Sequence, residues 1–391
     1  MTLLALRNTV QTYDWGSRTA IPTLQGRPPS AEPEAELWMG AHPKAASEVL
    51  WDGVWTPLDA VIRRAPEAVL GAAVRRSYGP RLPFLFKVLA AAKPLSIQAH
   101  PAVAQAVAGF ERENAAGIPL DDDARNYRDR HHKPEVLCAL TEFTVLRGFR
   151  PIAESAERLG RLGIDLPTGS WRELLTAFLA IEQGAPILAP IAELDPDDDD
   201  LVLRWARRLA DAFPGDRGAL APFLLELVEL APGEAVFTGP GILHAYLQGV
   251  GIELMASSDN VLRGACTSKH VDAAELTRIV RFEATDDGRV VPERTDGVQR
   301  FLSPADEFLL SRLQVTPDRP HVRRGEQRLG VEILLATEGE GRLISDRGDA
   351  RPYRHGDAFL VTGGEAAGYR IEGAATWFRA EVARCPEIST D

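Results

Sequence analysis

The stretch from Pro83 to Pro101, PFLFKVLAAAKPLSIQAHP, contains the pattern that decides the fold of this chain. Its residues 95–100, LSIQAH, alternate apolar and polar side chains. Because successive side chains of a strand point to opposite faces, we expect Ser96, Gln98 and His100 on one face of a strand. The imidazole and the carboxamide oxygen can both bind a metal. Taken alone, this pair fits an exposed strand face better than a metal site.

Two later segments place further metal-binding groups beside predicted strands. The segment His131-His132-Lys133-Pro134-Glu135 leads into the apolar run 136–140. The segment 237–246, FTGPGILHAY, is a Pro-Gly turn followed by a strand that carries His244. Each segment is a weak signal by itself. Together with residues 98 and 100 they offer imidazole, carboxylate and carboxamide groups from three separate parts of the chain.

The composition narrows the class of protein. The chain has 391 residues, of which 45% are apolar, so two or three domains with a sizeable core are expected. A net charge of −12 argues against a nucleic-acid binder but leaves room for a locally basic pocket that binds a small anion. The three cysteines are widely spaced and suit free thiols in a reducing cytoplasm. No signal peptide and no membrane-spanning run are expected.

The order of predicted elements indicates a mainly β protein with a helical insert. Short strands separated by Pro-Gly turns are typical of a jelly roll. From Pro151 the sequence favours helix, and Ser170 with Glu173 fits a capping box. Strands predicted at 330–335, 341–344, 355–361 and 375–378 form a second, smaller jelly roll in which we find no ligand set. His355 is expected in a turn. Residues 83–149 are expected to be mostly strands, and a helix is predicted over residues 267–280.

Several long segments resemble the type I mannose-6-phosphate isomerases, also called phosphomannose isomerases. In the order of that family, the matching segments are Tyr13-Asp14-Trp15-Gly16, residues 35–40 (AELWMG), residues 83–101, residues 132–135 (HKPE) and residues 251–264 (GIELMASSDNVLRG). The resemblance covers most of the chain. It implies two cupin-like jelly-roll domains with an inserted α-helical domain. We expect residues 1–150 with 215–299 as the catalytic domain, 151–214 as the insert and 300–391 as the C-terminal domain.

The resemblance also implies a site. It assigns one zinc ion per chain to four ligands: Gln98, His100, Glu135 and His244. The sequence itself does not select zinc over Mn²⁺, Fe²⁺ or Co²⁺. Arg263 and Lys133 match catalytic positions. The positions around the substrate are matched by Ser96, Lys87, His132, Glu253 and Asp259, of which Ser96 and Lys87 match positions near the phosphate.

The activity implied by the resemblance is the interconversion of mannose 6-phosphate and fructose 6-phosphate, which passes through an enediol. Such a reaction needs a base and an acid, a stabiliser for the oxyanion and an anchor for the phosphate. A cupin-type metal oxygenase and a non-catalytic sugar-phosphate sensor are the alternatives. The expected partner is a small sugar phosphate, with no nucleic acid and no membrane, and the oligomeric state stays open.

One segment departs from the family pattern. After Arg263 the chain reads GACTSK over residues 264–269, where the family commonly has Ala-Gly-Leu-Thr-Pro-Lys. The glycine is shifted by one position and the proline is lost. We therefore expect a different loop shape here, with less effect on the chemistry.

Overall fold

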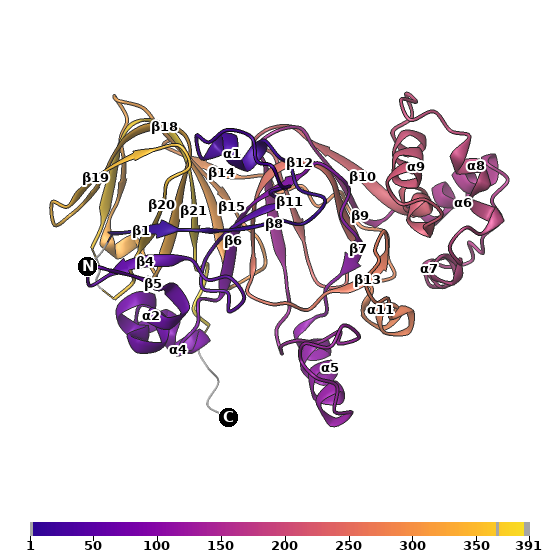
Figure 1. Cartoon of the computed structure of the whole chain (residues 1–391), viewed down its shortest axis with the longest axis horizontal. Coiled ribbons are helices and arrows are strands. Elements are labelled where there is room, and N and C mark those ends of the chain that lie inside the picture. The colour runs from indigo at the N-terminus through magenta and orange to yellow at the C-terminus, as the bar shows by residue number, and fades with distance from the viewer. Residues whose placement is uncertain (1–2, 365–366, 387–391) are drawn as a thin grey trace.

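Antiparallel strands dominate the computed structural model of this chain, which describes residues 3–364 and 367–386 (Figure 1). The strands form one sheet of ten and one of eleven strands. The prediction of a mainly β protein is therefore confirmed. Residues 1–2 and 387–391, which the predicted first and last domains include, lie outside the described residues.

The ten-stranded sheet is built around one long strand, β12 (His244–Ala256), which pairs with β6, β7, β8 and β9. Its order is β10-β9-β12-β6-β3-β2, with β7, β8, β11 and β13 paired beside this path. The other bounds are β2 (Thr9–Gln11), β3 (Glu36–Met39), β6 (Phe84–Ala91), β7 (Ile97–Ala99), β8 (Glu135–Ala139), β9 (Phe143–Phe149), β10 (Leu225–Leu230), β11 (Ala235–Thr238) and β13 (Leu262–Ala265).

The eleven-stranded sheet joins the two ends of the chain, because β1 pairs with β20 and β4 extends the sheet. Its order is β14-β15-β16-β21-β18-β20-β1-β4-β5, with β17 beside β21 and β19 beside β18. The bounds are β1 (Leu3–Arg7), β4 (Glu48–Trp51), β5 (Val54–Pro57), β14 (Glu293–Thr295), β15 (Val298–Phe301), β16 (Leu309–Val315), β17 (His321–Arg323), β18 (Glu332–Ser345), β19 (Ala350–Arg354), β20 (Ala358–Val361) and β21 (Tyr369–Glu381). The strands predicted at 330–335 and 341–344 are parts of the single strand β18, and those predicted at 355–361 and 375–378 overlap β20 and β21. Residues 330–331 and 355–357 lie outside these strands, and His355 lies in a turn, as predicted.

Residues 151–214 are helical, without a strand among them. The helices here and just beyond are α6 (Ile152–Arg161), α7 (Trp171–Ala180), η1 (Pro186–Leu188), α8 (Ala189–Ala192), α9 (Leu201–Ala212), η2 (Arg217–Leu220) and α10 (Ala221–Leu224). Leu174, Phe178 and Leu209 of this set share a core with Ala245 of β12 and with Leu243, which lies just before that strand. Whether these helices are a separate domain, and where the three domains divide, stay predictions.

The remaining helices correct two expectations. The bounds are α1 (Ala20–Leu24), α2 (Leu58–Arg64), α3 (Pro66–Leu70), α4 (Ala72–Tyr78), α5 (Val103–Ala115), α11 (Ala273–Ile279) and η3 (Gly325–Gln327). Helix α5 lies in a region expected to be mostly strands. Its buried face consists of Ala106, Gly109 and Glu113, which are too small or too polar to give an apolar period. Helix α11 was expected over 267–280 but begins after Asp272, whose side chain caps it. None of the helices in the described ranges is long and apolar enough to cross a membrane.

One face of each sheet packs against the other sheet. A large apolar cluster between the two sheets contains Phe86 and Leu254 from one and Ile333 and Phe378 from the other. Helices α7 and α9 cover a further part of the ten-stranded sheet, where Ile97, Ala99 and Ala245 pack against them. The opposite side, which we call the inner face, carries Leu89, Leu137, Val145 and Tyr246. Because successive side chains of a strand point to opposite faces, every second residue of these strands points to the inner face.

Candidate metal centre

Three strand ends bring the proposed histidine and glutamate ligands to the inner face of the ten-stranded sheet. His100 directly follows β7, and Glu135 and His244 are the first residues of β8 and β12. Gln98 lies opposite His244 in the β7–β12 register, so their side chains share a face. The alternation predicted over residues 95–100 is present from Ile97 to Ala99, since these two residues pack under the helices. Leu95 lies before the strand and packs instead against the inner-face cluster, so the prediction was wrong for this residue.

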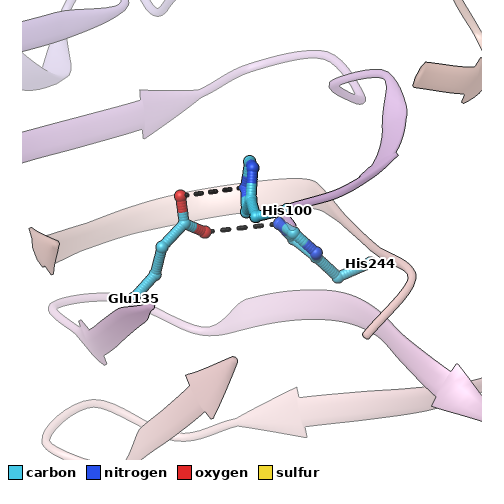
Figure 2. Close-up of side chains that lie close together, drawn as sticks. All are labelled: His100, Glu135 and His244. Atoms are coloured by element: carbon cyan, nitrogen blue, oxygen red, sulfur yellow. Dashed lines mark ion pairs between the residues drawn. The ribbon is translucent and has the colours of Figure 1, made fainter. Parts of the chain in front are cut away.

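The two imidazoles converge on the carboxylate of Glu135 (Figure 2). The Nε2 atom of His100 lies 3.3 Å from Oε1, and the Nε2 atom of His244 lies 3.3 Å from Oε2. The potential ligand atoms of the three residues all lie within 4.8 Å of one another. None of the three side chains is more than 2% exposed. The cluster is therefore enclosed by protein.

Hydrogen bonds on the far side of each ring fix which nitrogen is free. The Nδ1–H of His100 donates to the carbonyl oxygen of Asn260 at 2.7 Å, and that of His244 donates to the carbonyl oxygen of Ile242 at 3.0 Å. A carbonyl only accepts, so each Nε2 atom carries a lone pair. Within the described residues, both Nε2 atoms and Oε2 of Glu135 are buried without a hydrogen-bond partner.

The surroundings of the cluster favour an anionic Glu135 and a neutral His100. Burial opposes ionisation of Glu135, but Lys133, whose Nζ atom lies 2.8 Å from Oε1, and His100 hold the pKa of this carboxyl well below its usual value. Burial and the charge of Lys133 lower the pKa of His100 to about 4. At neutral pH Glu135 and His100 therefore have the protonation states that metal ligands require.

These residues fit a divalent metal ion. Two neutral imidazole nitrogens and one carboxylate are a usual ligand set for Zn²⁺. The buried atoms without a hydrogen-bond partner support the same conclusion. Leaving such atoms unsatisfied costs free energy, and a bound metal ion would satisfy them. No cysteine belongs to the group, and Gln98 offers an oxygen from the same face. Such a set leaves a position at which a substrate oxygen can bind.

A row of buried charges continues from the cluster along the inner face. Trp38, Lys87 and Glu253 lie opposite one another on β3, β6 and β12. The Nζ atom of Lys87 lies 3.0 Å from Glu253 and 3.2 Å from Glu36. The indole N–H of Trp38 donates to Glu36 at 2.9 Å. Although burial opposes it, these carboxylates raise the pKa of Lys87, which therefore remains protonated.

Arg263 is a partly buried cation without a carboxylate partner among the described residues. It lies on β13, opposite Gln98 of β7, so its side chain leaves the sheet on the face of the metal cluster. Burial and the neighbouring charge of Arg128 lower the pKa of Arg263. Burial and the charge of Arg263 in turn lower the pKa of Lys269. A buried guanidinium without a counter-ion is suited to an anionic ligand.

Contacts with the segment around η2 hold the loop after Arg263. Cys266 adopts a left-handed conformation with φ of 55°, which is uncommon for a residue other than glycine. Its N–H donates to Asp216 at 3.0 Å. Arg217 donates to the carbonyl oxygen of Gly264 at 3.0 Å, which ties the loop to η2.

The other predicted site residues have protein partners. The Nε2 atom of His132 lies 2.7 Å from Glu307, and the hydroxyl of Ser96 donates to Gln98 at 3.4 Å. Asp259 contacts His42 and Lys44.

Sequence reasoning missed three of these partners: Glu36, His42 and Glu307. Glu36 gave a usable signal, because a glutamate that alternates with buried apolar residues in a strand needs a partner. His42 and Glu307 lie in loops and gave no periodic signal.

Known proteins are similar to this chain in sequence and structure. A family model described as "Phosphomannose isomerase type I, catalytic domain" matches residues 3–152. The mannose-6-phosphate isomerase of Salmonella typhimurium is 38% identical over 367 residues, which cover 87% of this chain and 90% of that protein. The Escherichia coli protein of the same name is 39% identical over 354 residues, covering 86% and 89%.

Solved structures of mannose 6-phosphate isomerases are also similar to this chain. A zinc-bound holo mannose 6-phosphate isomerase has a TM-score of 0.89 and 34% identity, covering 98% of this chain and 100% of that one. A Salmonella typhimurium mannose 6-phosphate isomerase with substrate (f6p) and zinc has a TM-score of 0.88 at the same identity and coverage. These similarities confirm the predicted cupin-like fold. Together with the sequence matches, they show that the chain belongs to the type I phosphomannose isomerase family.

Proposed function

We propose that this protein is a zinc-dependent isomerase that interconverts mannose 6-phosphate and fructose 6-phosphate. The observation that carries the proposal is the cluster of His100, Glu135 and His244, with its unpartnered buried ligand atoms, beside the unpaired Arg263. Relatives with this activity in their names support it. Nothing in the structure favours an oxygenase or a sugar-phosphate sensor.

The reaction moves a proton between C1 and C2 of the open-chain sugar. We propose that His100, Glu135, His244 and Gln98 hold one zinc ion, which when bound polarises the oxygens of the substrate. Arg263 then holds the phosphate or the developing enediolate, because it carries a permanent charge that no carboxylate neutralises. Lys133 and Asp259 are the candidates for moving the proton.

The structure supports a different use of Lys87 from the one expected. Its ammonium group is enclosed by Glu36 and Glu253 and stays protonated, so it is unsuited to act as a base. Its charge is already balanced, which also makes it a weak anchor for phosphate. We propose that Lys87 instead holds Glu253 on the inner face, where burial raises the pKa of that carboxyl.

The proposal extends to the setting of the enzyme. Cys138, Cys266 and Cys385 are unpaired, which suits the reducing cytoplasm. A net charge of −12 makes nucleic acid an unsuitable partner. The basic groups at Arg263, Arg128 and Lys269 lie together despite this overall charge, as a site for a sugar phosphate requires.

A coupled assay for fructose 6-phosphate, run under argon with mannose 6-phosphate, tests the function. We expect turnover that a strong chelator abolishes and Zn²⁺ restores. Turnover that needs oxygen would favour an oxygenase, and tight binding of mannose 6-phosphate without turnover would favour a sensor. Full activity in verified metal-free protein would remove zinc from the proposal.

A further inference from the structure

The carboxylate of Asp259 is held by two residues, and its backbone is held by a third. Its Oδ1 atom lies 3.4 Å from Nε2 of His42, and its Oδ2 atom lies 3.0 Å from Nζ of Lys44. Its backbone N–H donates to Asp129 at 2.8 Å. Burial opposes ionisation, but His42 and Lys44 lower the pKa of the Asp259 carboxyl. Both the backbone and the side chain of this residue are therefore fixed, although the side chain is 29% exposed.

His42 is oriented for this contact. It is 5% exposed, and its ring packs edge-on against Trp38 with centroids 4.9 Å apart. Its Nδ1 atom accepts a hydrogen bond from the backbone N–H of Lys44 at 3.3 Å. An acceptor nitrogen carries no proton, so neutral His42 has its N–H at Nε2, directed at Asp259. This tautomer is the opposite of the one found in His100 and His244.

The pair lies beside the proposed active site. Trp38, which supports His42, donates to Glu36 and so belongs to the row of charges that includes Lys87. On the other side, Asp259 precedes Asn260, whose carbonyl accepts the hydrogen bond that orients His100. A shift of the Asp259 carboxylate would therefore occur next to both the metal ligands and the buried charges.

We propose that His42 is a positioning residue that fixes the Asp259 carboxylate toward the bound sugar. The inference rests on the proposed function, in which Asp259 contacts the substrate. His42 contacts Oδ1 through its Nε2 atom, and Lys44, which is exposed, contacts Oδ2. The remaining lone pairs of the carboxylate can then accept a hydrogen bond from a sugar hydroxyl or a proton. Such fixing raises the fraction of productive encounters without a direct contact between His42 and the substrate.

A double-mutant cycle tests this role. His42→Phe keeps a flat ring against Trp38 and removes the N–H, while Asp259→Asn changes the group that His42 is thought to orient. We expect His42→Phe to lower kcat/KM for mannose 6-phosphate by roughly 10- to 100-fold, with bound zinc unchanged. In the Asp259→Asn background the same change should have less than about a twofold effect, because residues that act as a unit are not additive.

Rescue and controls separate positioning from general damage. His42→Gln restores a donor and should recover part of kcat/KM, whereas Lys44→Met, which removes the exposed partner, should cost less than His42→Phe. If His42→Phe does not fold, His42→Ala carries the same cycle. Equal losses in both backgrounds, or loss of zinc, would overturn the inference.

The proposed function and the inference fail in different ways. An active wild-type enzyme whose cycle is additive would refute the role of His42 alone. If the wild type shows no turnover, calorimetry measures the Kd for mannose 6-phosphate in each protein of the same cycle. A wild-type protein that neither converts nor binds this sugar phosphate would overturn both.

Discussion

The inner faces of the two sheets both carry buried charges, but they arrange them differently. The ten-stranded sheet holds three carboxylates and two ammonium groups, namely Glu36, Glu135, Glu253, Lys87 and Lys133. The eleven-stranded sheet holds three guanidinium groups and two carboxylates, namely Arg323, Arg328, Arg379, Glu332 and Glu381. In the ten-stranded sheet the guanidinium groups of Arg147 and Arg263 lie on the same face as the first set.

The network of the eleven-stranded sheet satisfies its carboxylates internally. Arg323 lies 3.1 Å from Glu332 and also pairs with Glu381, and Arg379 lies 3.3 Å from Glu381. The hydroxyl of Tyr369 donates to Glu332 at 2.8 Å. The atoms that lack a hydrogen bond here are donor nitrogens such as Nε of Arg379, not potential ligands. This network has no atoms left for a cation.

The comparison shows that buried charge by itself does not mark a functional site. What distinguishes the ten-stranded sheet is that unpartnered atoms with lone pairs converge within 4.8 Å. A divalent cation would satisfy these atoms. Matched substitutions in the two sheets should therefore have different kinds of effect.

The largest difference is expected between Glu135→Gln and Glu332→Gln, which each remove one buried charge without changing side-chain size. Glu135→Gln should lose zinc on dialysis and lower turnover on the order of 10³-fold, because a metal contributes several kcal/mol to the transition state. Metal analysis and steady-state kinetics measure this. Retained zinc with normal turnover would contradict the assignment of Glu135.

Glu332→Gln is the matched change in the other sheet. Breaking a buried ion pair on one side typically costs about 3–5 kcal/mol of unfolding free energy. We expect that loss in chemical denaturation, with the zinc content of the folded protein unchanged. A Glu332→Gln protein that folds stably but has lost zinc would remove the distinction between the two inner faces.

The next effect concerns Arg263, which has no carboxylate partner among the residues that the structure describes. Both Arg263→Ala and Arg263→Lys should lower turnover by about 10²–10³-fold, because a lysine lacks the planar fork of donors. Zinc should remain bound. Arg217 is the control, since it donates to Gly264 and Ile181 carbonyls beside the same strand. Arg217→Lys should affect stability more than turnover, and normal kinetics in both Arg263 variants would make Arg263 structural.

A pH effect distinguishes the eleven-stranded sheet. Burial, with the charges of Arg379 and Arg323, lowers the pKa of His321 to about 4. In the unfolded chain its pKa is about 6.5, so between these values the unfolded state binds one more proton and stability falls as the pH falls. From pH 7 to pH 5 the wild type should lose about 2 kcal/mol more than His321→Gln. Denaturant titrations at the two pH values measure this loss. A loss of the same size in wild type and in His321→Gln would contradict the environment described for His321.

The sequence predicted the strand alternation at residues 97–99 and the turn before His244 because both depend on local spacing. The convergence of His100, Glu135 and His244 depends instead on pairing between distant strands, and only the family resemblance implied it. The contacts of His42 with Asp259 and of His132 with Glu307 join residues more than a hundred positions apart. No local pattern can indicate such pairs.

Helix α5 shows the other limit of the sequence. Its inward positions include Gly109, which lies directly beneath the ring of Tyr127 and leaves no room for a larger side chain. A helix that packs through small residues has almost no hydrophobic period, although it is buried on one side. The helices of residues 151–214 pack through leucine and phenylalanine, so the sequence shows their hydrophobic periodicity.

The smallest expected effect tests whether those helices are independent of the metal. The Ser170 side chain accepts a hydrogen bond from the N–H of Glu173 at 3.2 Å and caps α7. Ser170→Ala should lower the free energy of unfolding by about 1 kcal/mol. Thr176→Ala is the control, because its hydroxyl only bonds back to Arg172 within the helix, and it should change stability by less than about 0.5 kcal/mol. Both proteins should keep their zinc. Loss of zinc from folded Ser170→Ala would mean that the helices, which share a core with Ile97 and Ala245, also hold the metal ligands in place.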